Sequence, residues 1–278
     1  MIDESAIWND AEYVVAEKEN GQIFEISPDY GCRLIEFNDE SPAIDAYSEY
    51  IEGMNRVEFL GNRLSRPVSL EFLIYDENPR DILRKVNRFF SQDQKIFLRH
   101  SPEFGFRYVC QAQTMTHEKL NRKIIKVHIE FSCQNPTKES VDIFEFNYPE
   151  KIRTLDGSWL LDGSVNLDGG MRVPFFFDPD SDVELDPRAY FLEVEFRGES
   201  KNLIIQNETT GDIFNYAGTT KKEDYLLITG SKVLLNGKSV IRETNKTLIN
   251  FAPGENVLRV QNFMGVFKLT IRFRKQHF

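Results

Sequence analysis

Residues 65–90, SRPVSLEFLIYDENPRDILRKVNRFF, join a strand pattern to a helix pattern. The first part has the two-residue period of a strand with one buried face, and its apolar positions are Val68, Leu70, Phe72 and Ile74. The pattern breaks at residues 76–79, where Asn78 can act as a helix N-cap and Pro79 fits the first helical position. This stretch therefore predicts a strand that leads directly into a helix.

The helix that follows is predicted to be amphipathic. Its apolar stripe consists of Ile82, Leu83, Val86, Phe89 and Phe90, spaced as on one face of about three turns. Its opposite face carries the basic side chains Arg80, Arg84, Lys85 and Arg88. Lys95 to Arg99 reads as the next strand. We expect one helix that covers an open face of a β-sandwich, with no catalytic group implied.

The rest of the first half adds further strands and one expected loop. Lys123 to Ser132 alternates clearly, and weaker strand signals precede residue 38. The stretch from Asn38 to Gly53 is polar and acidic and predicts a long loop, which in a compact domain is usually functional. A polar stretch that extends to about Pro149 predicts a linker. We therefore expect two domains, residues 1–145 and 146–278.

The second half shows short strand patterns separated by turns and no convincing helix, which predicts a β-sandwich or jelly roll. Asn236-Gly237 is the strongest hairpin signal, because a type I′ turn needs positive φ at both central residues. The expected strands are Tyr190 to Phe196, Leu203 to Gln206, Tyr225 to Thr229, Lys232 to Leu235, Ser239 to Arg242, Thr247 to Phe251, Val257 to Gln261 and Val266 to Arg274.

Composition excludes several classes of protein. The chain of 278 residues has a net charge of −10, and residues 1–52 hold 14 acidic and 2 basic side chains, so a nucleic-acid surface is not expected. No apolar run is long enough for a membrane span, and the N-terminus lacks the pattern of a signal peptide. Three cysteines without CxxC spacing suggest neither a disulfide framework nor a zinc site.

No catalytic, cofactor or metal constellation stands out, so we expect no enzyme. The acidic run from Asp178 to Asp186 could offer oxygen ligands to Ca²⁺, but Val183 stands where an EF-hand loop needs glycine, and a solvated loop is expected. The four histidines show no metal spacing. Trp159 and Tyr190 could stack on a sugar, although a single Trp in a β-sandwich is more often part of the core.

The chain resembles the distal tail protein (Dit) family of long-tailed phages that infect Gram-positive bacteria. The resemblance lies in Gly61-Asn62-Arg63 with residues 65–90, and in the second half in LIIQNETTGDIFNYAG (203–218), DYLLITGSKVLLNGKSV (224–240) and FAPGENVLRV (251–260). It implies a first domain built as a β-sandwich with one helix, and a galectin-like second domain.

The resemblance also implies a structural function at the tail tip of the virion, after synthesis in the host cytoplasm. First domains would close a homo-hexameric ring that joins the tail tube to a tail-associated hub protein, and second domains would anchor receptor-binding proteins. Arg80, Arg84, Lys85 and Arg88 are the expected inter-subunit contacts, facing the acidic segment before Gly53. The alternative is a carbohydrate-binding module for cell-wall saccharides, because a fold does not imply one function.

Overall fold

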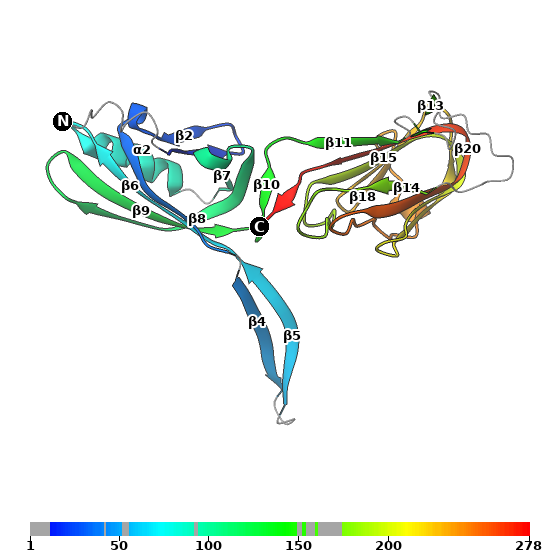
Figure 1. The fold of residues 1–278 in the computed structure, drawn as a ribbon, viewed down its shortest axis with the longest axis horizontal. Coiled ribbons are helices and arrows are strands. Elements are labelled where there is room, and N and C mark those ends of the chain that lie inside the picture. Colours follow the sequence, from blue (N-terminus) through cyan, green and yellow to red (C-terminus); the bar gives the residue numbers. More distant parts are fainter. Residues whose placement is uncertain are drawn as a thin grey trace. The chain divides into compact units, whose positions relative to one another are not determined.

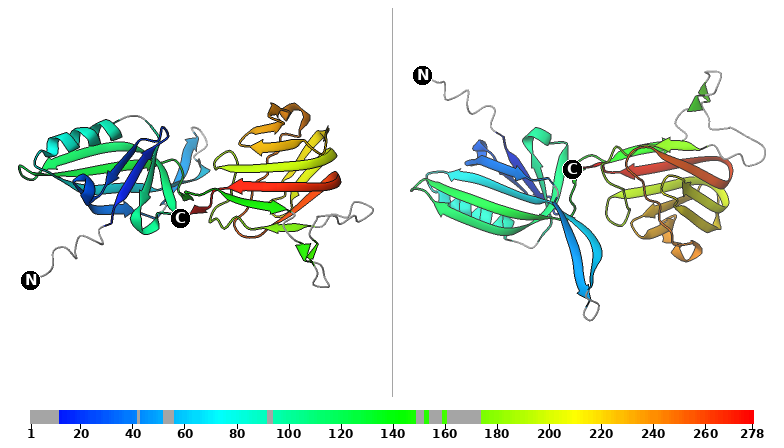
Figure 2. Two further views of the ribbon diagram at one scale, coloured as in Figure 1. Left: turned by 90° about the horizontal axis from the view of Figure 1, so that it is seen from above. Right: turned by 60° about the horizontal axis from the view of Figure 1, so that its bottom comes forward.

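The computed structural model describes residues 12–41, 43–51, 56–91, 94–148, 152–153, 159–160 and 174–278, with the backbone alone for 43–51, 56–65, 152–153 and 159–160. The chain divides into two compact units, Met1–Val141 together with Phe278, and Asp142–His277. Both units are built almost entirely from antiparallel strands (Figures 1 and 2), which confirms the predicted mainly-β class. No helix among the described residues is long and apolar enough to cross a membrane.

The expected linker before Pro149 is wrong in part. Lys138–Ser140 forms strand β10, which pairs with β8, and Phe144–Tyr148 forms β11 in the second unit. The second unit therefore begins at Asp142, before the expected boundary at residues 145 and 146. The stretch looked like a linker because polar residues separate these short strands, whose pairing partners lie far away in the sequence.

The first unit is one curled sheet whose strands run in the order β2-β1-β7-β8-β9-β6-β3. A short turn containing a 3₁₀ helix at Pro28–Tyr30 joins β2 to β3, so the two edges of the sheet must lie near each other. The strands are β1 Val14–Lys18, β2 Ile23–Ile26, β3 Cys32–Asp39, β6 Pro67–Tyr75, β7 Ile96–His100, β8 Phe106–Lys119 and β9 Ile124–Cys133.

Helix α2, Pro79–Phe90, covers this curled sheet as predicted. Its buried side chains Val86, Phe89 and Phe90 pack in one core with the alternating apolar residues of β6 and β9, and Ile82 and Leu83 pack at the edge of that core. Asn78 stands at the N-cap position but makes no capping hydrogen bond. Its amide instead donates to the Asp81 carboxylate at 2.7 Å.

The expected loop between Asn38 and Gly53 is wrong. Strands β4 (Ala43–Ile51) and β5 (Arg56–Ser65) form a two-stranded antiparallel sheet of their own. They follow directly from the paired strands β3 and β6, so that the hairpin continues this pair beyond the sheet (Figure 1). The polar and acidic composition of the stretch hid these strands, because the sequence signal expected of a strand is apolar alternation.

The second unit is a sandwich made by two long strands that each serve both layers. β15 (Leu192–Asn207) pairs with β17 through its first half and with β16 through its second half. β20 (Asn256–Phe273) pairs with β14 near its start and with β11 near its end. Register shifts at Gly198/Glu199 and between Ser200 and Ile204 mark the bend, as β-bulges do in strands that change layers.

The remaining strands complete the two layers around one apolar core. They are β14 Phe175–Phe177, β16 Ile213–Thr220, β17 Tyr225–Thr229, β18 Lys232–Leu235 and β19 Lys238–Ser239, with a separate pair β12 Ile152–Arg153 and β13 Trp159–Leu160. The hairpin at Asn236-Gly237 is confirmed, with φ of 49° and 78°.

Other strand predictions for this unit need correction. The four segments expected at residues 190–196, 203–206, 257–261 and 266–274 belong to only two strands, β15 and β20. The strand expected from Ser239 to Arg242 is replaced mainly by a 3₁₀ turn at Ile241–Glu243. Thr247 to Phe251 is not a strand, apart from one bridge between Phe251 and Leu185, and its buried Ile249 and Phe251 explain the misleading pattern.

Candidate functional site

The predicted contact residues Arg80, Arg84, Lys85 and Arg88 all lie exposed on α2, opposite its buried stripe. The Arg84 guanidinium pairs with the Asp81 carboxylate at 2.9 Å, with both side chains more than half exposed. Within the part of the chain that the structure describes, no ion pair engages the other three cations. The helix therefore presents a solvated basic face, which is the form that an electrostatic docking surface takes.

Some of the acidic residues that were expected to face this helix form ion pairs within the first unit instead. Glu17 lies 3.6 Å from Arg99 and Glu19 lies 3.3 Å from Lys95, both across the first unit's own sheet. Asp29, Glu36 and Glu40 remain exposed. Residues 1–11 and the side chains of residues 43–51 lie outside the described part of the chain. Among the described acidic side chains before Gly53, these three are the exposed ones that form no ion pair.

The β4–β5 hairpin is the second candidate surface, and a buried cluster holds its base. Arg66, which links β5 to β6 and is only 6% exposed, forms an ion pair with Asp39 at the end of β3. Its guanidinium also donates to the Pro136 carbonyl at 3.3 Å and lies 5.3 Å from the ring centre of Tyr108. The Tyr108 hydroxyl donates to the same Asp39 carboxylate.

This cluster fixes the point where the hairpin leaves the sheet. Burial and the bond to Asp39 raise the pKa of Tyr108, so its hydroxyl keeps its proton and its donor role. Sequence reasoning missed these residues, because Asp39, Arg66 and Tyr108 are far apart in the chain and form no motif.

A polar pocket of about 390 Å³ adjoins the hairpin base. Phe37 stacks on His100 with ring centres 4.5 Å apart, and Lys138 pairs with Glu103 at the rim. The lining residues are Phe37, Asn38, Asp39, His100, Pro102, Glu103, Phe106, Tyr108 and Lys138. Its charged groups already have partners, because Lys138 pairs with Glu103, Asp39 with Arg66 and His100 with Glu12. The pocket thus adjoins the polar contacts that hold the hairpin base.

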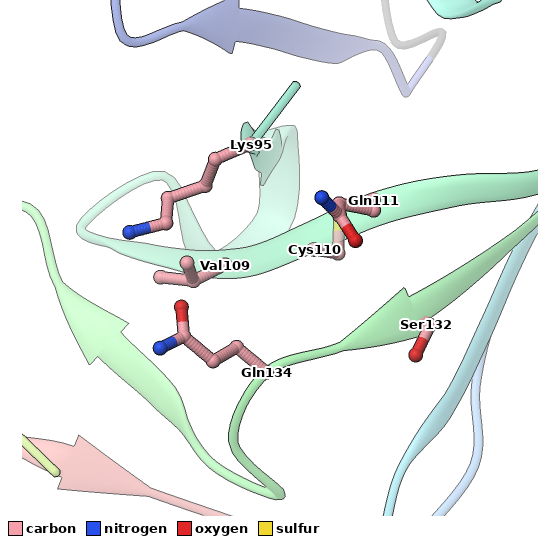
Figure 3. Close-up of a pocket in the computed structure, with 6 residues that line it drawn as sticks. All are labelled: Lys95, Val109, Cys110, Gln111, Ser132 and Gln134. Carbon is pink, nitrogen blue, oxygen red and sulfur yellow. The ribbon is translucent and has the colours of Figure 1, made fainter. Parts of the chain in front are cut away.

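A smaller pocket of about 240 Å³ lies beside the paired ends of β8 and β9 (Figure 3). It is lined by Lys95, Val109, Cys110, Gln111, Ser132 and Gln134. Among the described residues that line it, the polar groups are amides, a hydroxyl, a thiol and an ammonium, without a carboxylate or a histidine.

Exposed apolar side chains gather in the second unit where β20 bulges. Phe263, Met264 and Val266 are 37%, 45% and 54% exposed, although they lie within a strand. Asn262 and Gly265 adopt φ of 64° and 70°, which turns these side chains outward. Contiguous exposed apolar residues are unusual on a monomer and are typical of protein contact surfaces.

The acidic run from Asp178 to Asp186 divides its carboxylates among separate partners. Asp180 binds Lys275 at 2.6 Å, Asp186 binds Arg188 at 2.5 Å, and Glu184 accepts from Asn250 at 2.7 Å. Lys275 and Arg188 hold the pKa values of Asp180 and Asp186 below their usual range. No group of three metal-binding side chains occurs among the described residues.

The residues weighed for sugar stacking gain no support. Tyr190 is half-buried and packs against the core of the second unit. The side chain of Trp159 lies outside the described part of the chain.

Comparison with known proteins gives a likeness in fold. The SPP1 Dit protein (gp 19.1), described as a paradigm of the hub of the adsorption apparatus in phages that infect Gram-positive bacteria, is similar at a TM-score of 0.66 and 13% identity, over 95% of this chain and 98% of that one. The phage p2 baseplate in its activated conformation gives 0.43 at 9% identity, over 94% and 97%. The tail of an empty GTA particle gives 0.24 at 14% identity, over 43% and 90%. No protein-family model and no curated sequence matches the chain.

Proposed function

We propose that the chain is a distal tail protein, the structural hub at the tail tip of a phage that infects Gram-positive bacteria. The observation that carries the proposal is the likeness in fold to SPP1 Dit, which extends over 95% of the chain and thus over both units. A likeness limited to one sandwich would be weak support, because that architecture serves many functions. Two different β-rich units in the same order form a much rarer combination.

The proposed mechanism is assembly without a chemical step. Six first units form a homo-hexameric ring through a heterologous interface whose rotation closes. The exposed basic face of α2 and the projecting hairpin support this proposal. An isolated two-stranded hairpin is marginally stable in water, so β4 and β5 gain stability when a neighbouring subunit or tail protein pairs with them.

The ring joins the tail tube to a tail-associated hub protein, and the galectin-like second units anchor receptor-binding proteins. The exposed apolar residues Phe263, Met264 and Val266 support the second role, because an anchored protein would cover them. The proposed site of action is the virion tail tip. The protein is proposed to have no enzymatic activity, a proposal that agrees with carboxylates already paired with cations in the acidic run.

Electron microscopy of the purified full-length chain in negative stain tests the proposal. We expect ring-shaped particles with sixfold symmetry, and labelled antibodies against the chain should bind at the tip of the intact tail. Single particles at every concentration, together with labelling elsewhere on the virion, would contradict the proposal. Binding of the monomer to purified cell-wall saccharides would then favour the carbohydrate-binding alternative.

A further inference from the structure

Two of the three cysteines lie directly opposite each other in the sheet of the first unit. Cys110 in β8 is the register partner of Cys133 in β9. Side chains directly opposite in an antiparallel pair point to the same face, and both of these contact the same apolar core. All three cysteines, including Cys32, are free thiols in the structure.

The pair occupies the type of position where a cross-strand disulfide fits. The amide of Gln134 donates to the Val109 carbonyl at 2.8 Å, so residues 109 and 134 are a hydrogen-bonded pair. The next pair, Cys110 and Cys133, is therefore non-hydrogen-bonded, with its Cα atoms about 4.5 Å apart. Disulfides span Cα separations of about 4.4–6.8 Å, so the backbone already meets the requirement.

We propose that Cys110 and Cys133 are a disulfide-forming pair that locks β8 to β9 when the chain meets an oxidising environment. The bond would lie next to Arg66, and so would fasten the sheet where the hairpin leaves it. This inference is independent of the proposed function, since it depends only on the register of two strands.

Burial protects the reduced pair from rapid oxidation, which explains how both cysteines persist as thiols. The Cys110 thiol is 2% exposed and donates a weak hydrogen bond to the Ile96 carbonyl at 3.5 Å. Burial raises the pKa of Cys133 to about 11, against an opposing effect of Arg66, and burial also raises the pKa of Cys110. Both thiols therefore remain protonated at neutral pH, and exchange is slow, because the thiolate is the nucleophile.

The reaction needs a small-molecule disulfide as oxidant. Cys133 is the partly exposed member, so its sulfur attacks one sulfur of the oxidant; the oxidant's S–S bond breaks, and the first leaving thiol carries away the Cys133 proton. Cys110 then attacks the Cys133 sulfur, and the second thiol leaves with the Cys110 proton. Two protein thiols are oxidised, and one disulfide is reduced to two thiols.

Cys32 supplies an internal control. It pairs with Ile74 at one end of β6, whereas Cys133 lies beside Pro67 and Ser132 at the other end. The seven residue steps from Pro67 to Ile74 extend roughly 23 Å at about 3.3 Å per step, which no disulfide can span. Cys32 therefore cannot form an intramolecular disulfide with Cys133.

The test exposes the full-length reduced chain to oxidised glutathione, blocks the remaining thiols under denaturing conditions, and maps the peptides by mass spectrometry. We expect one intramolecular Cys110–Cys133 disulfide, a mass lower by two hydrogen atoms, and Cys32 alone blocked. The melting temperature of the oxidised chain should rise, because the new bond closes a loop in the unfolded state. Cys32→Ala should keep both effects, and Cys133→Ser should lose both.

Three blocked cysteines after oxidation would overturn the proposal. A stable mixed disulfide of Cys133 with glutathione, a bond that includes Cys32, or a covalent dimer would overturn it as well. Because the wild-type peptide map decides between these outcomes, the test does not depend on the folding of either variant.

Discussion

At the scale of single residues, Arg272 connects three strands of the second unit. Its guanidinium reaches the carboxylates of Glu145, Glu193 and Glu195 at 3.1, 3.3 and 3.1 Å, from β20 to β11 and β15. Glu195 has a side chain only 9% exposed, so its charge depends on this partner and on Arg197. Removal of the cation would leave a partly buried cluster of like charges.

We expect Arg272→Met to lower the free energy of unfolding by about 1.5–3 kcal/mol at pH 7, the range for hydrogen bonds to charged groups. Asn147 and Arg272 lower the pKa of Glu145, and hydrogen bonds from Arg197 and Arg272 outweigh burial at Glu195 and lower its pKa too. Carboxylates with lowered pKa stabilise the fold above their unfolded pKa of about 4.3 and lose this effect as the pH falls.

The difference in the free energy of unfolding between wild type and Arg272→Met should therefore be largest at neutral pH and should shrink below about pH 4. Urea unfolding at pH 7 and pH 3.5 measures it. Arg188→Met is the matched control, because the Arg188 side chain is 65% exposed beside Asp186 and its loss should lower stability only slightly. An equal loss of stability at both pH values would show that packing, and not charge, explains the role of Arg272.

Single residues divide into those that the sequence predicts and those that it does not. The alternating positions of β6 and β9 and the stripe of α2 were predicted, because burial on one face leaves a periodic trace. The ion pair of Asp39 with Arg66 and the bond from Tyr108 were not, because contacts between distant residues have no period.

At the scale of elements, α2 has one face that packs in the core and one face that carries surface charge. Val86 is fully buried in the stripe, while the Arg84 side chain is 79% exposed. We expect Val86→Asp to cost about 4 kcal/mol or more, because it buries an unpaired carboxylate. Arg84→Asp should cost within about 1 kcal/mol. Thermal melts of both variants provide the measurement, and equal shifts would place the stripe on the wrong face of the helix.

The hairpin should serve assembly and contribute little to the stability of the first unit. β4 and β5 pair only with each other in the described strands. Replacement of residues 43–65 by an Asn-Gly turn should therefore leave the melting temperature nearly unchanged and prevent ring formation. Calorimetry and light scattering on the same sample measure the two effects. A large fall in melting temperature would mean that the hairpin belongs to the core.

Elements that depend on distant pairing were the hardest to predict. The hairpin lacks apolar alternation, and β15 and β20 each appeared as two strands because bulges near Gly198 and around residues 262–265 interrupt their pattern. Residues 247–251 show the opposite error, where burial of Ile249 and Phe251 imitated a strand. A local sequence pattern indicates which residues are buried, and it indicates which strands pair only indirectly.

At the scale of the whole molecule, the second unit should fold alone. It has its own core, and β11 at Phe144–Tyr148 belongs to its sheet. A fragment of residues 142–278 should give one cooperative melt and a β-type circular dichroism spectrum. A shorter fragment that starts at residue 150 lacks β11 and should be less stable. An unfolded 142–278 fragment would contradict the independence of this unit.

The absolute mass of the purified full-length chain, measured by light scattering across protein concentration and salt, tests the central claim most directly. A closed ring of six chains of 32.4 kDa predicts about 200 kDa. If the basic face of α2 contributes to the interface, the mass should fall as salt rises, because exposed charges are screened over about 10 Å at 0.1 M ionic strength. A mass of 32.4 kDa under every condition, with tail tube protein also present, would contradict the claim.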